Sequence, residues 1–407
     1  MVSTPAAGWA LQPTAEVPIV TPAMRTLFQL VHDDESMLSL CLHRKQMADD
    51  LEAAHADLPF RVDDSETTTK LVLPLPNTLT QSLIRHTLAY DILTRAKGLH
   101  TYPSEHKGVY AAAIAVQGRG GKFLSVDEIQ KLISAIQDYR RGVKLWLNHG
   151  KKWKPTSTSD RKRRTAVKDI DSQLVRLPRS PSDISKPRFG QSKRGLVRLE
   201  QLCSMLEGFG EAAATHAFGT TLPLHQSPLM IGCSSVSMKA RCRAHKYEYG
   251  GSFCNTTWTW EFALCVMASL GLEPEVVTVP ILVTFERVDL KAAEMLVTTL
   301  AQSLITQTGF NIVEGGGQAD DSPSHAVEEA RELVYARMPW FRENIQRACQ
   351  QMEHATTALR DWELSGQAWT DRMTERDKMM KTVQVGEAAK VDDWEPSDRG
   401  RDAPARD

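Results

Sequence analysis

The sequence PLMIG at residues 228–232 is a short apolar segment that ends in glycine, and it predicts a brief buried strand. Arg241 and His245 follow it four residues apart, so a helix at this position carries both side chains on one face. Far upstream, GVYAAAIAV at residues 108–116 predicts a second buried strand, which glycines at 118, 120 and 121 end.

A third apolar segment, residues 276–285, predicts another strand downstream of Arg241 and His245. The helix expected after it carries Glu294 and ends at Gly309, with Asn311 just beyond its end. The central order is therefore strand, helix with arginine and histidine, strand, and helix with one carboxylate.

Composition limits the classes of protein to consider. The chain has 407 residues, a net charge of −1 and 42% hydrophobic residues, enough for a sizeable core. It has no apolar run of the roughly 18 residues that a membrane helix needs, so no membrane partner is expected. Residues 1–22 lack the basic and apolar regions of a signal peptide. Seven scattered cysteines favour a reducing intracellular compartment over a disulfide framework.

Outside the central segments the pattern predicts mostly helices. One amphipathic helix is expected over residues 78–97, and another after Ser125, where Glu128 completes a capping-box pattern. Helical patterns also cover residues 196–209 and 326–381, and Pro339 is expected to break or kink the last of these.

Residues 151–198 contain fifteen basic side chains against four acidic ones, with few apolar residues. Such a segment buries too little surface to offset its ordering entropy, so most of it is predicted to be a mobile linker. The dense positive charge favours contact with nucleic-acid phosphates or a nuclear-import signal, and a solvated insert is the alternative. The residues predicted to bind nucleic acid are Lys151, Lys152, Lys154, Arg161, Lys162, Arg163 and Arg164.

The central segments together resemble the GIY-YIG nuclease family. The sequence GVY at 108–110 resembles the first signature of that family, and MIG at 230–232 resembles the second, with Met230 in place of a tyrosine. Arg241, His245 and Glu294 stand where the family keeps its arginine, histidine and metal-binding glutamate, and the segment 309–311 resembles the one that supplies its asparagine.

The resemblance implies an α+β fold in which a small three-stranded antiparallel sheet is flanked by helices within a largely helical chain. The two signature strands should pair antiparallel although more than a hundred residues separate them, since loop-closure entropy grows only with the logarithm of length. The implied organisation is a disordered N-terminus (1–22), a helical region (23–106), the GIY-YIG-like domain (107–317) with an insertion at about 122–226, C-terminal helices (325–382) and a disordered charged tail (386–407).

The implied function is a metal-dependent endonuclease that cleaves phosphodiester bonds in DNA, or a degenerate relative of one, and the basic segment favours a location in the nucleus. Glu294 would hold Mg²⁺ or Mn²⁺, and Arg241 would stabilise charge on the phosphoryl oxygens. Tyr110 or His245 would position or deprotonate the attacking water, and Asn311 would orient the phosphate or fix a neighbouring loop.

Structural alternatives exist for each of these residues. Tyr110 is equally consistent with an aromatic strand residue, Arg241 with a solvated helix face, Glu294 with a helix-dipole contact and Asn311 with a turn. A zinc site from Cys233, Cys242, His245 and Cys254, a Cys–His nucleophile pair, and a core position for Cys265 are further possibilities. Two other functional classes stay open: an inactive nucleic-acid-binding or interaction protein of this fold, and a helical scaffold unrelated to nucleases.

Overall fold

The structure is a computed structural model that describes residues 22–32, 37, 40, 65–94, 99–150, 157–173, 186–216, 220–245, 258–285, 289–312 and 324–391. The chain falls into two compact units, Met1–Ala348 and Cys349–Asp407. The described helices and strands, in chain order, are α1 (Pro22–His32), α4 (Ser65–Val72), α5 (Asn77–Ile84), α6 (Leu88–Thr94), β1 (Gly108–Val116), α7 (Val126–His149), α8 (Thr158–Ser172), α9 (Lys193–His216), β2 (Leu229–Ser234), α10 (Met238–His245), α11 (Trp258–Ser269), β3 (Pro274–Val283), α12 (Asp289–Leu300), α13 (Ser324–Glu332), the π-helical turn η4 (Leu333–Arg337) and α14 (Pro339–Val391).

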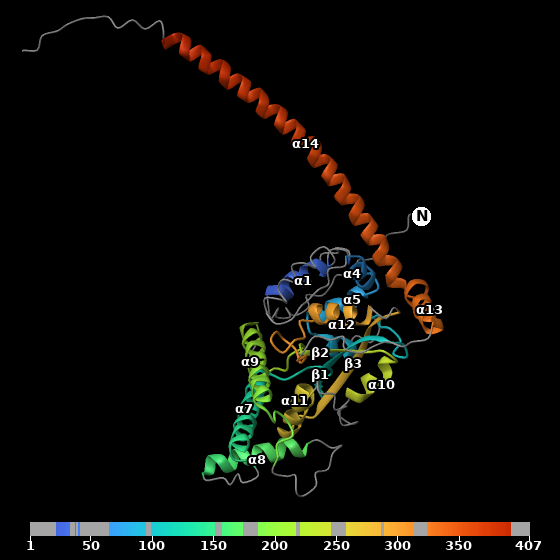
Figure 1. The fold of residues 1–407 in the computed structure, drawn as a ribbon, viewed down its shortest axis with the longest axis vertical. Helices are drawn as coiled ribbons and strands as arrows, with labels where there is room; N and C mark the ends of the chain where they lie inside the picture. The colour runs from blue at the N-terminus through green and yellow to red at the C-terminus, as the bar shows by residue number, and fades with distance from the viewer. Residues whose placement is uncertain are drawn as a thin grey trace, which may run out of the picture. The chain divides into compact units, whose positions relative to one another are not determined.

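The sheet has three antiparallel strands in the order β2-β1-β3 (Figure 1). Strand β1 pairs with β2 so that Tyr110 lies opposite Gly232, and it pairs with β3 so that Tyr110 lies opposite Pro280. The predicted α+β fold and the antiparallel pairing of the two distant signature strands are therefore confirmed.

Strand β1 is the centre of the molecule because both of its faces are buried along its whole length. Ala111, Ala113 and Ala115 pack into one apolar cluster with residues of α5, α6 and α12. Ala112 and Ile114 pack into a second cluster with residues of α7, α9 and α11. Strand side chains alternate between faces, so helices cover both sides of the sheet, with α12 on one side and α11 on the other (Figure 1).

Two glycines near the start of β1, one on β1 and one on β2, permit close packing. Gly108 has φ +155°, and a Cβ atom there would lie 2.1 Å from the carbonyl oxygen of Leu282. A Cβ atom at Gly232 would lie 2.5 Å from the hydroxyl oxygen of Tyr110. The first glycine lets β1 approach β3, and the second makes room for the Tyr110 side chain.

The capping box before α7 is confirmed: Ser125 accepts a hydrogen bond from the Glu128 N–H, and Glu128 accepts one from the Ser125 N–H. The single helix expected over residues 78–97 is wrong, because α5 and α6 are separated at His86, which has φ +59°. The helix carrying Glu294 ends at Leu300 rather than Gly309, and turns connect it to Asn311.

The prediction of a mobile basic linker is wrong for residues 157–173 and 186–195, whereas the helix predicted from residue 196 is confirmed within α9. Residues 158–172 form α8, which packs against α7 and buries Val167 and Ile170. Tyr139 of α7 donates a hydrogen bond to Asp171, which also accepts one from the backbone N–H of Arg188. These contacts bury enough surface and satisfy enough polar groups to order the segment despite its charge.

Pro339 does interrupt the C-terminal helical region, since η4 ends before it and α14 begins at it. The prediction of a disordered tail from residue 386 is wrong for residues 386–391, which belong to α14. The remaining tail, the N-terminal residues 1–21, and Lys151, Lys152 and Lys154 lie outside the described residues. Among the described helices, none is both long and apolar enough to cross a membrane.

Candidate active site

Tyr110 and His245 form the core of the candidate site. The Tyr110 hydroxyl oxygen lies 2.7 Å from Nε2 of His245, although the two residues are 135 positions apart in the chain. Tyr110 projects from β1 across Gly232, and His245 projects from the last turn of α10. A direct hydrogen bond thus joins the strand tyrosine and the helix histidine.

The electrostatic environment keeps this pair neutral. Burial raises the pKa of Tyr110 well above its ordinary value, and the nearby Arg241 guanidinium opposes that rise. Burial, assisted by Arg241, lowers the pKa of His245 to about 4. At neutral pH the pair is therefore a protonated phenol beside an uncharged imidazole, which retains the capacity to take up a proton.

Arg241 lies one helical turn before His245 on the same side of α10, and it is close enough to Tyr110 to lower the pKa of the phenol. Glu294 acts on the same phenol with the opposite sign, raising its pKa. Glu294 belongs to α12, a helix that shares one apolar cluster with Tyr110 and with residues of α10. The site therefore joins β1, α10 and α12 around one phenol, and Glu294 reaches that phenol by electrostatic interaction.

The side chains of the candidate site have little exposure to solvent. Relative exposure is only 3% for Tyr110, 6% for His245 and 6% for Glu294. A phosphodiester bond that reacts at this site has to reach side chains that are almost entirely covered.

Asn311 is positioned differently from the other predicted site residues. Its side-chain oxygen accepts a hydrogen bond from the Ile231 N–H at 2.8 Å, and its side-chain nitrogen donates one to the Ile231 carbonyl at 2.7 Å. Because β2 is an edge strand, Asn311 pairs with backbone groups that a fourth strand would otherwise occupy. The geometry favours the predicted alternative in which Asn311 fixes a loop.

Met230 occupies the position at which the family resemblance expects a tyrosine. Its side chain is buried in the apolar cluster that also contains Trp260 and Phe310. The thioether fills core volume at this position, so no hydroxyl from β2 is added to the Tyr110–His245 pair.

Cys233 and Cys242 lie near Tyr110 and raise the pKa of its phenol, a proximity that the sequence interpretation did not use. The spacing supplied a signal, since Cys242 lies next to Arg241 and three residues before His245.

Among the described residues, no group of three histidine, cysteine or acidic side chains is arranged to hold a metal ion. The predicted zinc alternative also requires Cys254, which lies outside the described residues. Cys265 is buried in the core as predicted.

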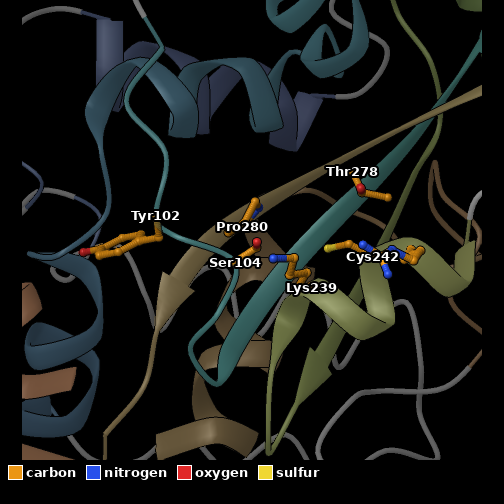
Figure 2. Close-up of a pocket in the computed structure, with 7 residues that line it drawn as sticks. Tyr102, Ser104, Lys239, Cys242, Thr278 and Pro280 are labelled. Atoms are coloured by element: carbon orange, nitrogen blue, oxygen red, sulfur yellow. The ribbon is translucent and has the colours of Figure 1, made fainter. Parts of the chain in front are cut away.

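A pocket of about 420 Å³ lies beside α10, and none of the predicted catalytic residues lines it. Figure 2 shows Lys239 and Cys242 of α10 facing Thr278 and Pro280 of β3, with Tyr102 and Ser104 at the side. Lys239 and Arg243 line this pocket from one flank of α10, whereas Arg241 and His245 lie on its other flank. Cys242 lies between the two flanks, so the pocket and the Tyr110–His245 pair are neighbours on the same helix.

The basic residues of the predicted nucleic-acid interface are partly neutralised. Lys162 forms an ion pair with Asp138 at 3.1 Å, and Arg163 forms one with Asp160 at 3.3 Å. Arg161 is exposed on α8 and Arg164 is partly buried there. These four residues therefore lie on a helix rather than on a flexible arm.

Comparisons with known proteins give no assignment. No protein-family model matches the chain, and no significant match appears among curated proteins or among solved structures.

Proposed function

We propose that the chain is a metal-dependent nuclease related to the GIY-YIG family, which hydrolyses phosphodiester bonds in DNA. The observation that carries the proposal is the 2.7 Å contact between Tyr110 and His245. Arg241, from the same helix α10 as His245, and Glu294, from α12, act electrostatically on the same phenol. Four residue types suited to phosphoryl transfer, drawn from three separate segments, thus converge on one hydroxyl group.

The chemistry of the proposed reaction follows from the state of the Tyr110–His245 pair. Water attacks phosphorus as the bond to the leaving oxygen breaks, and the proton of that water has to be accepted. The Tyr110 hydroxyl takes this proton while it passes its own to Nε2 of His245, which is neutral at physiological pH because its pKa is about 4. Arg241 stabilises the charge that develops on the phosphoryl oxygens.

A divalent metal is compatible with the donor set. Mg²⁺ is commonly held by one or two carboxylates together with water and substrate phosphate, so a single carboxylate such as Glu294 satisfies its preference for oxygen. Glu294 would hold the ion, which would supply charge stabilisation for the leaving oxygen. The proposal also includes entry into the nucleus, with the basic residues of α8 and its flanks as the import signal and as phosphate contacts.

The test is cleavage of branched, duplex and single-stranded DNA by the full chain with Mg²⁺ or Mn²⁺. Glu294→Gln removes the carboxylate charge at nearly constant size, so it is expected to slow cleavage on the order of a hundredfold or more. The matched control is Glu353→Gln on the exposed face of α14, which should cleave like the wild type. Wild-type rates in Glu294→Gln would refute the metal role of Glu294.

A second candidate function is an inactive nucleic-acid-binding protein with the same fold. Two observations favour it: the near-complete burial of Tyr110, His245 and Glu294, and the core position of Met230. Salt-sensitive DNA binding by a wild-type protein that cleaves none of the three substrates with either metal would support this candidate and reject the nuclease.

A further inference from the structure

Helix α14 carries a stripe of apolar side chains exposed to solvent. Over Cys349–Asp407, the second unit, the large exposed apolar residues include Leu359 at 60%, Trp362 at 71% and Trp369 at 60% exposure. Two tryptophans at such exposure on one helix are unusual, because burying an aromatic side chain is strongly favourable. Most of the stability of a helix in a protein comes from packing of its apolar face, so a stripe of this kind favours a partner.

The stripe repeats every seven residues. One set of residues recurs at steps of seven, and we assign it to position a of a heptad labelled a to g: Met352, Leu359, Gly366, Met373 and Met380. The d positions three residues further on are Ala355, Trp362, Trp369 and Arg376. A repeat of 3.5 residues per turn, sustained over four heptads and about 42 Å of helix, is the pattern of a left-handed coiled coil.

The core layers fit a second copy of the same helix in parallel register. When the two helices pair in parallel register, Gly366 lies opposite Gly366 of the other copy, and this core layer has no side-chain volume. The bulky Trp362 and Trp369 occupy the d layers on either side and can fill that volume. In this register the large layers lie directly beside the small one.

The flanking charges fit the same arrangement. In a parallel pair, each g position faces the e position five residues later on the other helix. Arg372 at g then faces Asp377 at e, and the symmetry of the pair creates this contact twice. None of the other three g–e pairs brings like charges together: they are Gln351 with Thr356, Ala358 with Glu363, and Ser365 with Thr370. Arg376 at a d position favours two strands over more, because its long stem can carry the guanidinium out to water.

We propose that residues 352–380 of α14 form a parallel two-stranded coiled coil with a second copy of this chain. The inference is independent of the proposed nuclease activity. It assigns the exposed stripe to self-association and the opposite face of α14 to solvent.

The test is the mass of the full chain in solution, measured by sedimentation at chain concentrations from about 1 to about 100 µM. The wild type should sediment as two chains. Leu359→Glu combined with Trp362→Glu places like charges in adjacent core layers, so the dissociation constant should rise on the order of a hundredfold or more. Both residues are exposed within one chain, so the folding of the single chain should be unaffected.

Leu364→Glu is the matched control. Leu364 is 71% exposed on the same helix but occupies an f position on the outer face, so its replacement should leave the two-chain species intact. Orientation is tested by Ala355→Cys in a Cys349→Ser background, which should cross-link two chains under mild oxidation because parallel d positions face each other. A one-chain mass throughout, a mass of three or more chains, equal disruption by Leu364→Glu, or no cross-link would overturn the proposal.

Discussion

Two buried histidines link single residues to the behaviour of the fold in acid. Burial lowers the pKa of His86 and of His245 to about 4. His86 also fixes the break between α5 and α6, since its Nε2 lies 2.6 Å from the carbonyl oxygen of Ala301. Both side chains are neutral in the folded chain at pH values where they are charged in the unfolded chain.

The pKa shifts predict that acid destabilises the fold. Because the folded pKa is below the unfolded value near 6.5, stability is fully present above pH 6.5 and falls as the pH drops toward 4. Between pH 7 and pH 5 each histidine should cost about 2 kcal/mol of unfolding free energy. Denaturant unfolding at both values measures this loss, and His245→Gln should reduce it by about half. His354→Gln, at an exposed site on α14, should leave the pH dependence unchanged, whereas equal unfolding free energies at pH 7 and pH 5 in the wild type would contradict the account.

At the scale of elements, the side chain of Asn311 pairs with Ile231 at the edge of β2, next to the backbone hydrogen bond from Phe310 to Leu229. Asn311→Ala removes both partners of the Ile231 backbone, so it should lower the unfolding free energy by about 1–3 kcal/mol. Asn311→Asp keeps the acceptor and should cost less. Denaturant unfolding and cleavage rates should be measured on the same preparations. Loss of cleavage by Asn311→Ala with unchanged stability would show that the residue acts on substrate instead.

The attachment of α8 depends on Asp171, which accepts hydrogen bonds from the Tyr139 hydroxyl and the Arg188 N–H. Asp171→Ala leaves both donors without this buried carboxylate, at a cost of about 1–3 kcal/mol. Amide hydrogen exchange in α8 should therefore accelerate. Asp169→Ala, two residues away on the exposed face, is the control and should change nothing. Rapid exchange of α8 in the wild type would support the mobile linker that the composition predicted.

Local patterns predicted the elements better than their boundaries. Apolar runs located all three strands, and the Ser125–Glu128 spacing located the start of α7. The break at His86 had no comparable local signal, because the residue is held by a carbonyl 215 positions away. The order of α8 was missed for a similar reason, since composition does not reveal that Val167, Ile170 and Asp171 meet partners on other segments.

In the candidate site, too, some features could be predicted from the sequence and others could not. The family resemblance predicted the strand pairing across the long insertion, but it did not predict the hydrogen bond between Tyr110 and His245. It did not predict the depth of burial, because the motif does not show how closely the helices that carry its residues pack against β1. The pattern over residues 326–381 predicted a helix, but the prediction did not use the seven-residue spacing of Met352 and Leu359.

At the scale of the whole molecule, α8 is the surface at which nucleic-acid binding can be tested without unfolding the chain. If Arg161 and Arg164 neutralise phosphates of duplex DNA, replacing both by Gln should reduce the slope of log binding constant against log salt by about 0.9 per phosphate. Arg342→Gln with Arg360→Gln removes the same charge from exposed positions elsewhere and should leave the slope unchanged. An unchanged slope in the α8 variant would exclude these two arginines as phosphate-binding residues.

The central claim is that Tyr110 and Glu294 serve one reaction, and a double-mutant cycle on single-turnover DNA cleavage with Mg²⁺ tests it most directly. Residues that act as one unit are strongly non-additive, so Tyr110→Phe and Glu294→Gln should each slow cleavage on the order of a hundredfold. The double variant should then be no more than a few-fold slower than the slower single variant. Effects that multiply to about ten-thousandfold, or a wild type that cleaves no DNA, would contradict the account.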